Sequence, residues 1–363
     1  MTALRERLVR LIEATGPLSV ADYMAHCLFD PEQGYYTTRE PFGVSGDFTT
    51  APEISQMFGE LVAIWLYNAW TLAGRPETVV LAEIGPGRGT LMKDVVRILH
   101  QLDPGFVRQT RFELVETSPR LREIQRATLA DSLPAFAWHD SVATLPDGPL
   151  FIVGNELFDA VPQPQYVATD RGWRERMVGL DAAGNLCFAA GAGIPDRQLL
   201  PAGADSAPEG SIFELAPARS ALMSGIAARI GRHGGAGLFF DYGYEGPALG
   251  DTLQALRRHA PDDVLAHPGE ADLTSHVDFA ALAQAARQEN LTTRFMDQGE
   301  FLLGMGLLER AGALGAQADA ATRQRLQGEV DRLARPEQMG RLFKVLMVHT
   351  PGLVLPPGQA LAD

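Results

Sequence analysis

The chain has 363 residues, 46% hydrophobic and 21% charged, which is the composition of a globular protein large enough to fold around a core without disulfide staples. Two cysteines, Cys27 and Cys187, exclude a disulfide-rich scaffold and a cysteine-based zinc cluster. The formal net charge of −14 argues against nonspecific binding to nucleic acid.

The first part of the chain, residues 1–75, is predicted to be a helical extension. Residues 4–14 and 19–29 have apolar side chains at helical spacing, and Pro52 opens a strong amphipathic helix. Between them, residues 39–50 combine glycines with a polar and aromatic centre. That composition suits a lid over a ligand, and it suits a simple connecting loop equally well.

A different sequence pattern extends from residue 76 to residue 163. Short apolar runs alternate with amphipathic helical patterns, and the predicted strands are residues 79–82, 111–115, 136–138 and 150–153. Continuous apolar strands separated by helices are typical of a parallel sheet that is buried on both faces. We interpret this stretch as the first half of a Rossmann-like domain.

Residues 164–215 break the alternation. Three runs with alternating apolar and polar residues, 165–169, 173–180 and 186–190, predict a mostly β insertion. Residues 216–363 then return to strands and helices, and predict the second half of the domain with extra helices. The fold class is therefore α/β, a Rossmann-like sheet with helices on both faces, an N-terminal helical extension and a β-rich insertion.

The first predicted strand ends in a glycine loop, Glu83–Thr90, with the spacing E-x-G-x-G-x-G. A glycine-rich turn between a strand and its helix lets a nucleotide approach the backbone closely. Thr90 occupies the third glycine position of the dinucleotide fingerprint, so the loop fits S-adenosylmethionine (SAM) better than NAD. A tight turn without a cofactor is the alternative. We assign to the cofactor Glu83, Gly85, Pro86, Gly87 and Gly89.

Three further residues at strand ends complete the predicted cofactor site. Glu116 follows the second strand, where a carboxylate accepts hydrogen bonds from ribose hydroxyls in both NAD and SAM sites. Asp140 follows the third strand, where contacts to adenine are expected, and Asn155 follows the fourth.

The loop after the fourth strand is predicted to face the transferred group. Glu156 and Asp159 would bind a cation there, because carboxylates match the fork of a guanidinium. Alternatively, Asp159 caps a turn and Glu156 is solvated. His276 precedes Asp278, a plausible N-cap, and has no evident structural task. It would accept or relay a proton, or be an ordinary hydrogen-bonded histidine.

Over nearly its whole length the chain resembles the MidA-like methyltransferases, relatives of a mitochondrial complex I assembly factor that methylates arginine. The segments that carry the resemblance are residues 46–60, 83–92, 155–160, 241–244, 250–255 and 272–279. The resemblance implies a class I Rossmann-like methyltransferase fold and SAM as cofactor. For the mitochondrial relative it also implies a protein arginine as acceptor.

A more distant likeness is to the protein arginine methyltransferases with a paired-glutamate loop. Glu156 stands at the position of their first glutamate, but their second falls at Gln165. His276 resembles the histidine of their Thr-His-Trp loop, although the Trp position holds Val277. These departures speak against a simple transfer of their two-acid clamp to this chain.

The sequence thus predicts a SAM-dependent N-methyltransferase that acts on a protein arginine, with a complex I subunit among the possible partners. Its predicted catalytic residues are Glu156, His276 and Asp159. A small amine as acceptor and a SAM-binding assembly factor or chaperone without turnover are the alternatives.

We expect no metal, because the two cysteines exclude a cysteine-based cluster, and no nucleic acid, because the chain is acidic. We expect no membrane insertion, since no run of about 18 apolar residues occurs. The expected location is the cytoplasm, because the first residues show no apolar leader region and Glu6 and Glu13 argue against a transit peptide. The presence of only two lysines, Lys93 and Lys344, beside abundant Ala and Gly indicates a GC-rich bacterium.

Overall fold

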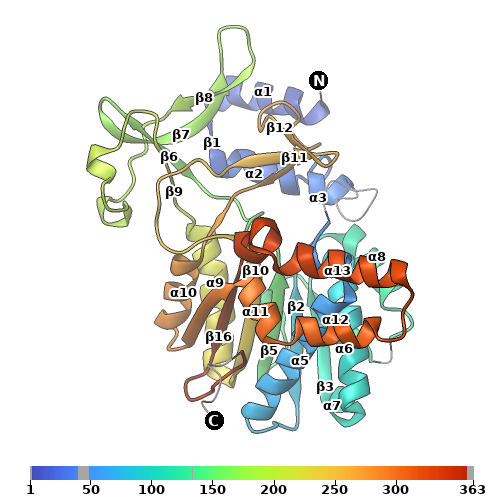
Figure 1. Cartoon of the computed structure of the whole chain (residues 1–363). Helices are drawn as coiled ribbons and strands as arrows, with labels where there is room; N and C mark the ends of the chain where they lie inside the picture. The colour runs from blue at the N-terminus through green and yellow to red at the C-terminus, as the bar shows by residue number, and fades with distance from the viewer. Residues whose placement is uncertain (1, 40–48, 133, 358–363) are drawn as a thin grey trace. The chain divides into compact units, whose positions relative to one another are not determined.

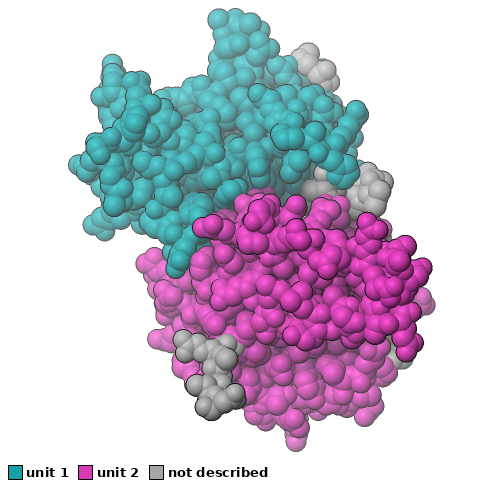
Figure 2. Space-filling model, viewed as in Figure 1, with its two compact units in different colours: residues 1–48, 158–222, 244–282 teal, residues 49–157, 223–243, 283–363 magenta. Residues whose placement is uncertain are grey.

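The computed structural model describes residues 2–39, 49–132 and 134–357 and divides into two compact units (Figure 2). Unit 1 consists of residues 1–48, 158–222 and 244–282, and unit 2 of the remaining three segments, 49–157, 223–243 and 283–363. Of the stretch predicted as a lid, residues 40–48 lie outside the described part of the chain.

Unit 2 is built around a mixed sheet with the strand order β15-β16-β10-β5-β2-β3-β4 (Figure 1). Its strands are β2 (Val79–Ile84), β3 (Thr110–Val115), β4 (Phe136–His139), β5 (Leu150–Asn155), β10 (Gly235–Tyr244), β15 (Thr292–Asp297) and β16 (Phe343–His349). The pairs from β10 to β4 are parallel, and β16 runs antiparallel to both β10 and β15. The predicted α/β class with a mainly parallel sheet is confirmed.

The central strands are buried along their whole length, which explains their continuous apolar sequence. All six residues of β2 are buried, and so are the first five of β5. Alternate residues of a strand face opposite sides of the sheet, so one strand contributes to two cores. Leu81 and Phe151 join one apolar cluster with the helices of this unit, which contains Trp65, Leu99 and Leu333.

The helices of unit 2 are α4 (Ala51–Ile54), α5 (Gln56–Leu72), α6 (Thr90–Leu102), α7 (Pro104–Gln109), α8 (Pro119–Thr128), α11 (Gln298–Gly304), α12 (Leu307–Gly315) and α13 (Ala320–Ala334). The single helix predicted from Pro52 is in fact two. Ser55 has extended backbone angles, and its hydroxyl accepts a hydrogen bond from the Met57 amide, so it caps α5.

Unit 1 has two small sheets and the N-terminal helices. One sheet has the order β1-β7-β6-β9 with β8 beside β7, and the other the order β12-β11-β13. The helices are α1 (Ala3–Thr15), α2 (Val20–Phe29) and α3 (Tyr35–Thr38). The strands are β1 (Leu18–Ser19), β6 (Gln165–Thr169), β7 (Gly172–Leu180), β8 (Leu186–Ala190), β9 (Ile212–Glu214), β11 (Gln254–Arg257), β12 (Ala260–Asp262), β13 (Asp272–Thr274) and β14 (Val277–Asp278). An apolar cluster that includes Leu8, Tyr23 and Leu273 is its main core.

The chain passes between the units several times, and three elements have residues in both: α9 (Pro217–His233), β10 and α10 (Phe279–Gln288). Asp278 accepts hydrogen bonds from the amides of Ala280 and Ala281, which confirms it as the N-cap of α10. Within the described ranges, no helix is long and apolar enough to cross a membrane.

Candidate active site

The predicted cofactor residues of unit 2 lie at the carboxyl edge of its parallel strands. Ile84 is in register with Val115, and Val115 with His139. The ladder extends one step further, since the Glu116 amide donates to the His139 carbonyl at 3.0 Å. Strand register therefore brings together at one edge groups that are far apart in the sequence, and ligands of open α/β sheets bind at this edge.

The glycine loop has the backbone that its sequence predicts. Gly85, Gly87 and Gly89 have φ values of +65°, +52° and +83°, a region that residues with a Cβ rarely adopt. The Gly89 amide donates to the Pro86 carbonyl at 2.7 Å, and Gly89 is the N-cap of α6. A Cβ on Gly85 would lie 3.2 Å from the Leu157 side chain. The loop is thus a compact turn in which side chains would fill the space beside the backbone.

Two buried oxygens at this edge have no hydrogen-bond partner among the described residues: Oε2 of Glu83 and Oδ1 of Asn155. Glu83 is 2% exposed, and burial raises its pKa well above the usual range. Buried polar atoms are nearly always hydrogen-bonded in folded proteins, so these two indicate a ligand with donors. The ammonium group of a methionine moiety is such a donor, and its positive charge would favour the ionised form of Glu83.

Glu116 is held in a fixed orientation by its neighbours. Its Oε1 accepts from the Ser118 amide at 2.8 Å, and its Oε2 accepts from Nε2 of Gln125 at 3.2 Å. The same Nε2 donates to the Gly87 carbonyl at 2.8 Å, and Oε1 of Gln125 accepts from the Trp138 indole at 2.9 Å. The fully buried Gln125 therefore connects the glycine loop with Glu116. Sequence reasoning missed it.

Asp140 is the most exposed of the predicted cofactor residues, with 83% of its side chain accessible. It forms an ion pair with Arg122 at 2.6 Å, and Nε of Arg122 also donates to the Glu116 carbonyl at 2.7 Å. Arg122 thus ties the ends of β3 and β4 to each other.

Thr90, whose side chain distinguishes this loop from a dinucleotide site, has a partner that the sequence did not reveal. Its hydroxyl donates to Oε1 of Glu53 at 2.5 Å, and Arg88 lies 3.9 Å from the other oxygen of the same carboxylate. The short helix α4 is therefore anchored at the start of α6.

Glu156 follows β5 directly and has a φ of +51°, which is uncommon for a residue with a side chain. Its amide donates to the Phe240 carbonyl at 2.9 Å, and one of its carboxylate oxygens accepts from Nδ2 of Asn155 at 3.2 Å. Backbone outliers of this kind concentrate at functional sites, where neighbouring contacts hold them in place.

Asp159 and His276 belong to unit 1, where backbone contacts link their segments. The Ser275 amide donates to the Asp159 carbonyl at 3.1 Å, and Arg219 donates to the carbonyls of both Asp159 and His276, at 3.0 and 2.8 Å. The Asp159 carboxylate accepts from the Ala160 amide at 2.9 Å, which is the local turn contact weighed as an alternative. The structure therefore brings together the loops of two predicted catalytic residues through Arg219, which the sequence did not single out.

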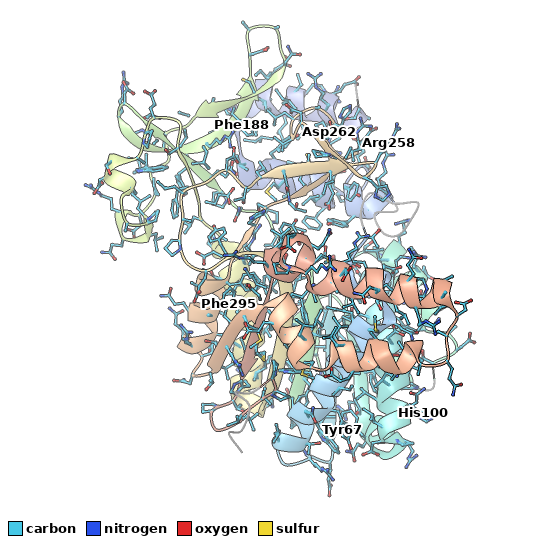
Figure 3. All side chains as sticks on the ribbon, viewed as in Figure 1. Tyr67, His100, Phe188, Arg258, Asp262 and Phe295 are labelled. Carbon is cyan, nitrogen blue, oxygen red and sulfur yellow. The ribbon has the colours of Figure 1, made fainter. Side chains whose placement is uncertain are left out.

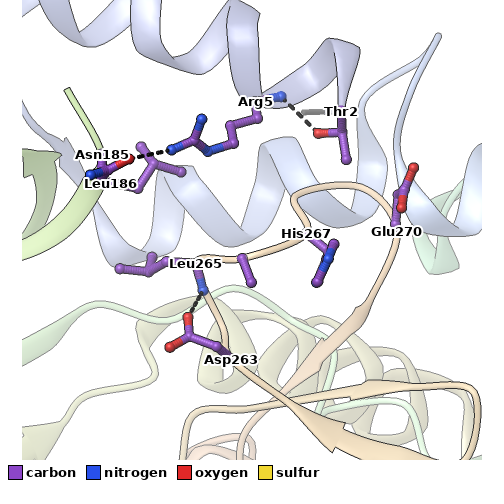
Figure 4. A pocket seen from close by; sticks show the side chains of 9 residues that line it. Thr2, Arg5, Asn185, Leu186, Asp263, Leu265, His267 and Glu270 are labelled. Atoms are coloured by element: carbon purple, nitrogen blue, oxygen red, sulfur yellow. Dashed lines mark hydrogen bonds between the residues drawn. The ribbon is translucent and has the colours of Figure 1, made fainter. Parts of the chain in front are cut away.

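Two pockets within the units lie apart from these residues. One, of about 510 Å³, is in unit 1 and is lined by Thr2, Arg5, Asn185, Leu186, Asp263, Leu265, Ala266, His267 and Glu270 (Figure 4). The other, of about 710 Å³, lies at the amino ends of β3 and β4. His100, which is labelled in Figure 3, is one of its lining residues. Neither contains a predicted site residue.

The sheet order and the glycine loop at its carboxyl edge define a Rossmann-like protein that binds a nucleotide-type cofactor. The family model described as "Putative S-adenosyl-L-methionine-dependent methyltransferase" matches residues 61–296, and the chain belongs to this family. The predicted SAM cofactor and methyltransferase activity are thereby confirmed, as is the MidA-like resemblance.

Similar proteins cover almost the whole chain. The protein arginine methyltransferase NDUFAF7, mitochondrial, of Danio rerio is 34% identical over 95% of this chain and 86% of its own length. The mouse protein of the same name is 35% identical over 94% and 83%. A crystal structure from Burkholderia thailandensis with bound S-adenosyl-homocysteine is 29% identical, has a TM-score of 0.82, and matches 96% of this chain and 92% of that chain.

The predicted cytoplasmic location is wrong. The absence of a leader pattern indicated a cytoplasmic protein, whereas the similar arginine methyltransferases of fish and mammals are mitochondrial proteins. The composition of the first residues is a weak guide to location, because it reveals only targeting signals that have a recognisable pattern.

Proposed function

We propose that this methyltransferase transfers the methyl group to a side-chain nitrogen of arginine in a protein substrate. The observation that carries the proposal is the similarity, over about 95% of the chain, to proteins named as protein arginine methyltransferases. It is supported by Glu156, a carboxylate in a strained backbone position directly after β5. A carboxylate at that end of the sheet suits a planar cation that is always charged.

On the cofactor side, Glu83 and Asn155 would bind the methionine part through the buried oxygens described above. Glu116 would accept hydrogen bonds from the ribose hydroxyls, with Asp140 toward the adenine. Gly85, Gly87 and Gly89, with Pro86 between the first two, form a turn whose glycines have left-handed backbone angles and would let the cofactor approach the backbone closely. When bound, SAM supplies an electrophilic methyl group on a sulfonium sulfur.

On the acceptor side, Glu156 would orient the guanidinium and stabilise its charge, so that one nitrogen attacks the methyl carbon in line. The nitrogen–carbon bond forms as the carbon–sulfur bond breaks, and S-adenosyl-homocysteine leaves with the electron pair. The attacking nitrogen loses one proton. His276 would accept it, because burial lowers the pKa of this histidine and keeps the imidazole neutral. Asp159 would fix its own loop, through the contact of its carboxylate with the Ala160 amide.

The experiment is methyl transfer from SAM with a tritiated methyl group into the proteins of an extract that lacks the endogenous enzyme. Acid hydrolysis and chromatography then identify the modified amino acid. We expect radioactive methylarginine. Label only in small amines would replace the proposal with a small-molecule methyltransferase, and binding of SAM without any label would indicate an assembly factor without turnover.

The finer proposal, a subunit of respiratory complex I as substrate, rests on the family resemblance alone. It is tested with the purified complex from cells that lack the enzyme. Methylarginine at a defined position in one of its subunits is the expected result, and label confined to other proteins contradicts it.

A further inference from the structure

The backbone amide and the backbone carbonyl of His276 are both held by polar side chains of unit 1. The His276 amide donates to Oγ1 of Thr252 at 2.9 Å, and its carbonyl accepts from Nη1 of Arg219 at 2.8 Å. One residue earlier, the Ser275 hydroxyl accepts from Nη2 of Arg219 at 2.6 Å, and the Ser275 amide donates to the Asp159 carbonyl. These four hydrogen bonds fix the backbone of Ser275 and His276 and the Ser275 hydroxyl.

Arg219 is the cationic member of this arrangement. It lies in the first turn of α9, and only 1% of the residue is exposed. Besides its bonds to Ser275 and His276, it donates to the carbonyls of Asp159 and Val161, at 3.0 and 3.2 Å. Burying a guanidinium is costly, and the cost is compensated only where its fork of donors is well used. Here the fork joins the loop that follows β5 to the loop that carries His276.

Glu214 is the anionic member. It ends β9, is 7% exposed, and acts on His276 through Thr252. The Thr252 amide and hydroxyl donate to the two oxygens of Glu214, at 3.0 and 2.5 Å, and the same Thr252 hydroxyl accepts from the His276 amide. Nε2 of the fully buried Gln165 donates to Glu214 at 2.7 Å. Gln165, the position where the arginine methyltransferase pattern has its second glutamate, thus lies against a carboxylate that comes from another strand.

We propose that Arg219 and Glu214 are positioning residues that hold His276 from its carbonyl and amide sides, and so fix where its imidazole stands and what charge it carries during methyl transfer. This inference rests on the role given to His276 in the proposed function. It adds to that role one residue from strand β9 and one from helix α9. No sequence motif indicates either residue.

The two residues have opposite electrostatic effects on the histidine. Burial lowers the pKa of His276 first of all, the Glu214 carboxylate raises it, and the Arg219 guanidinium lowers it. Both charges also act on Tyr244, whose pKa is raised by burial above all, so this phenol stays protonated. Loss of the cation should therefore raise the pKa of His276, and loss of the anion should lower it. A general loss of structure would move both variants toward the pKa of an unfolded histidine.

The test is a pH titration of the histidine ring signals of the full chain by NMR, with S-adenosyl-homocysteine bound and the His276 signal assigned from His276→Ala. Arg219→Met should raise the pKa of His276, and Glu214→Gln should lower it, each by on the order of one unit. The matched control is Arg229→Met. Arg229 lies in the same helix and donates to the carbonyls of Leu145 and Pro146, so its loss should leave His276 unchanged.

Arg219→Lys covers the case in which Arg219→Met fails to fold, because it keeps the charge and loses the fork. It should leave the pKa of His276 near the wild-type value and lower kcat for methyl transfer by about tenfold, with the affinity for SAM unchanged. Shifts of equal sign in Arg219→Met and Glu214→Gln, or no shift in either, overturn the inference. So does full activity of Arg219→Lys together with full activity of Glu214→Gln.

Failure of the proposed function gives a different result. If the wild-type enzyme methylates no arginine, or if His276→Ala is fully active, the catalytic role of the histidine is wrong. The opposite pKa shifts would then still show that Arg219 and Glu214 set its environment.

Discussion

The cofactor edge of unit 2 and the polar cluster of unit 1 are assembled in opposite ways. At the cofactor edge, Glu83 and the three glycines come from one loop, and strand register adds Glu116 and Asn155. In unit 1, the groups around His276 come from α9, from β9 and from the loop that contains Thr252. A site made from one motif tolerates little change in that motif, whereas a site made from dispersed contacts loses function in smaller steps.

Gly87→Val should have the largest effect on the cofactor edge. The φ of +52° disfavours a β-branched residue, and the added side chain enters the space where the loop meets the ligand. We expect no measurable binding of SAM by calorimetry while the protein still unfolds cooperatively. The matched control is Gly74→Val, also in unit 2 with a φ of +89°, where a Cβ meets nothing within 4 Å. It should lose stability but bind SAM normally. Tight binding by folded Gly87→Val would remove the basis of the assignment.

Glu156→Gln should have the largest effect on the acceptor side. The change keeps the volume and removes the charge that orients a guanidinium. We expect methyl transfer to fall at least about 100-fold, equivalent to about 2.7 kcal/mol of transition-state stabilisation, with near-normal affinity for SAM. Asp159→Asn should be milder, because the Asp159 carboxylate also makes the turn contact with the Ala160 amide. Methylation at the wild-type rate by Glu156→Gln would rule out the carboxylate clamp and point to an uncharged acceptor.

Glu116→Ala should lower the affinity for SAM by an intermediate amount. A carboxylate that accepts two ribose hydroxyls contributes about 1.5–3 kcal/mol, so the dissociation constant should rise roughly 10- to 150-fold. The matched control is Glu113→Ala, in the strand that Glu116 follows, where the side chain pairs with His139 at 2.8 Å instead. Glu113→Ala should leave the affinity unchanged. Equal affinities of Glu116→Ala and wild type would place the ribose elsewhere.

Much of the fold was predictable because the sheet strands of unit 2 are continuous apolar runs bounded by turn residues. The errors have local causes. Ser55 interrupts a helical pattern without disturbing its apolar face, so the break before α5 was not visible. The strands β1 and β11–β13 have two to four residues, too few for a periodic signal, and the partner of β1 lies about 160 positions away.

The candidate site was predictable to the extent that it is local. The loop Glu83–Gly89 and the strand-end residues follow from spacing and from the rule that ligands bind at the carboxyl edge. Contacts between distant residues were not predictable. Thr90 meets Glu53 from 37 positions away, and Arg219 meets the Asp159 carbonyl from 60. The place of Thr90 in the glycine loop does not indicate Glu53 as its partner, and no sequence pattern sets Arg219 apart from surface arginines.

The smallest expected effect is that of a substitution at Gln125. This residue lies outside the glycine loop but contacts both the loop and Glu116. Gln125→Met keeps the buried volume and removes the donor to Glu116 and to the Gly87 carbonyl, and the acceptor for Trp138. Hydrogen bonds of this kind contribute about 0.5–1.5 kcal/mol each, so the loss of one binding-relevant contact should weaken SAM about 2- to 12-fold.

The control for Gln125→Met is Gln298→Met, another fully buried glutamine of unit 2, whose amide donates to the Leu333 carbonyl. Both variants should lose stability in a thermal melt, because each removes a buried hydrogen bond. Only Gln125→Met should change the dissociation constant of SAM. The double variant Gln125→Met/Glu116→Ala should lose less binding free energy than the sum of the two single variants, because Gln125 acts in part by orienting the Glu116 carboxylate. Additive losses would show that Gln125 stabilises the loop alone. The affinity for SAM would then depend only on residues of the glycine loop and of the strand ends, which the sequence already indicates.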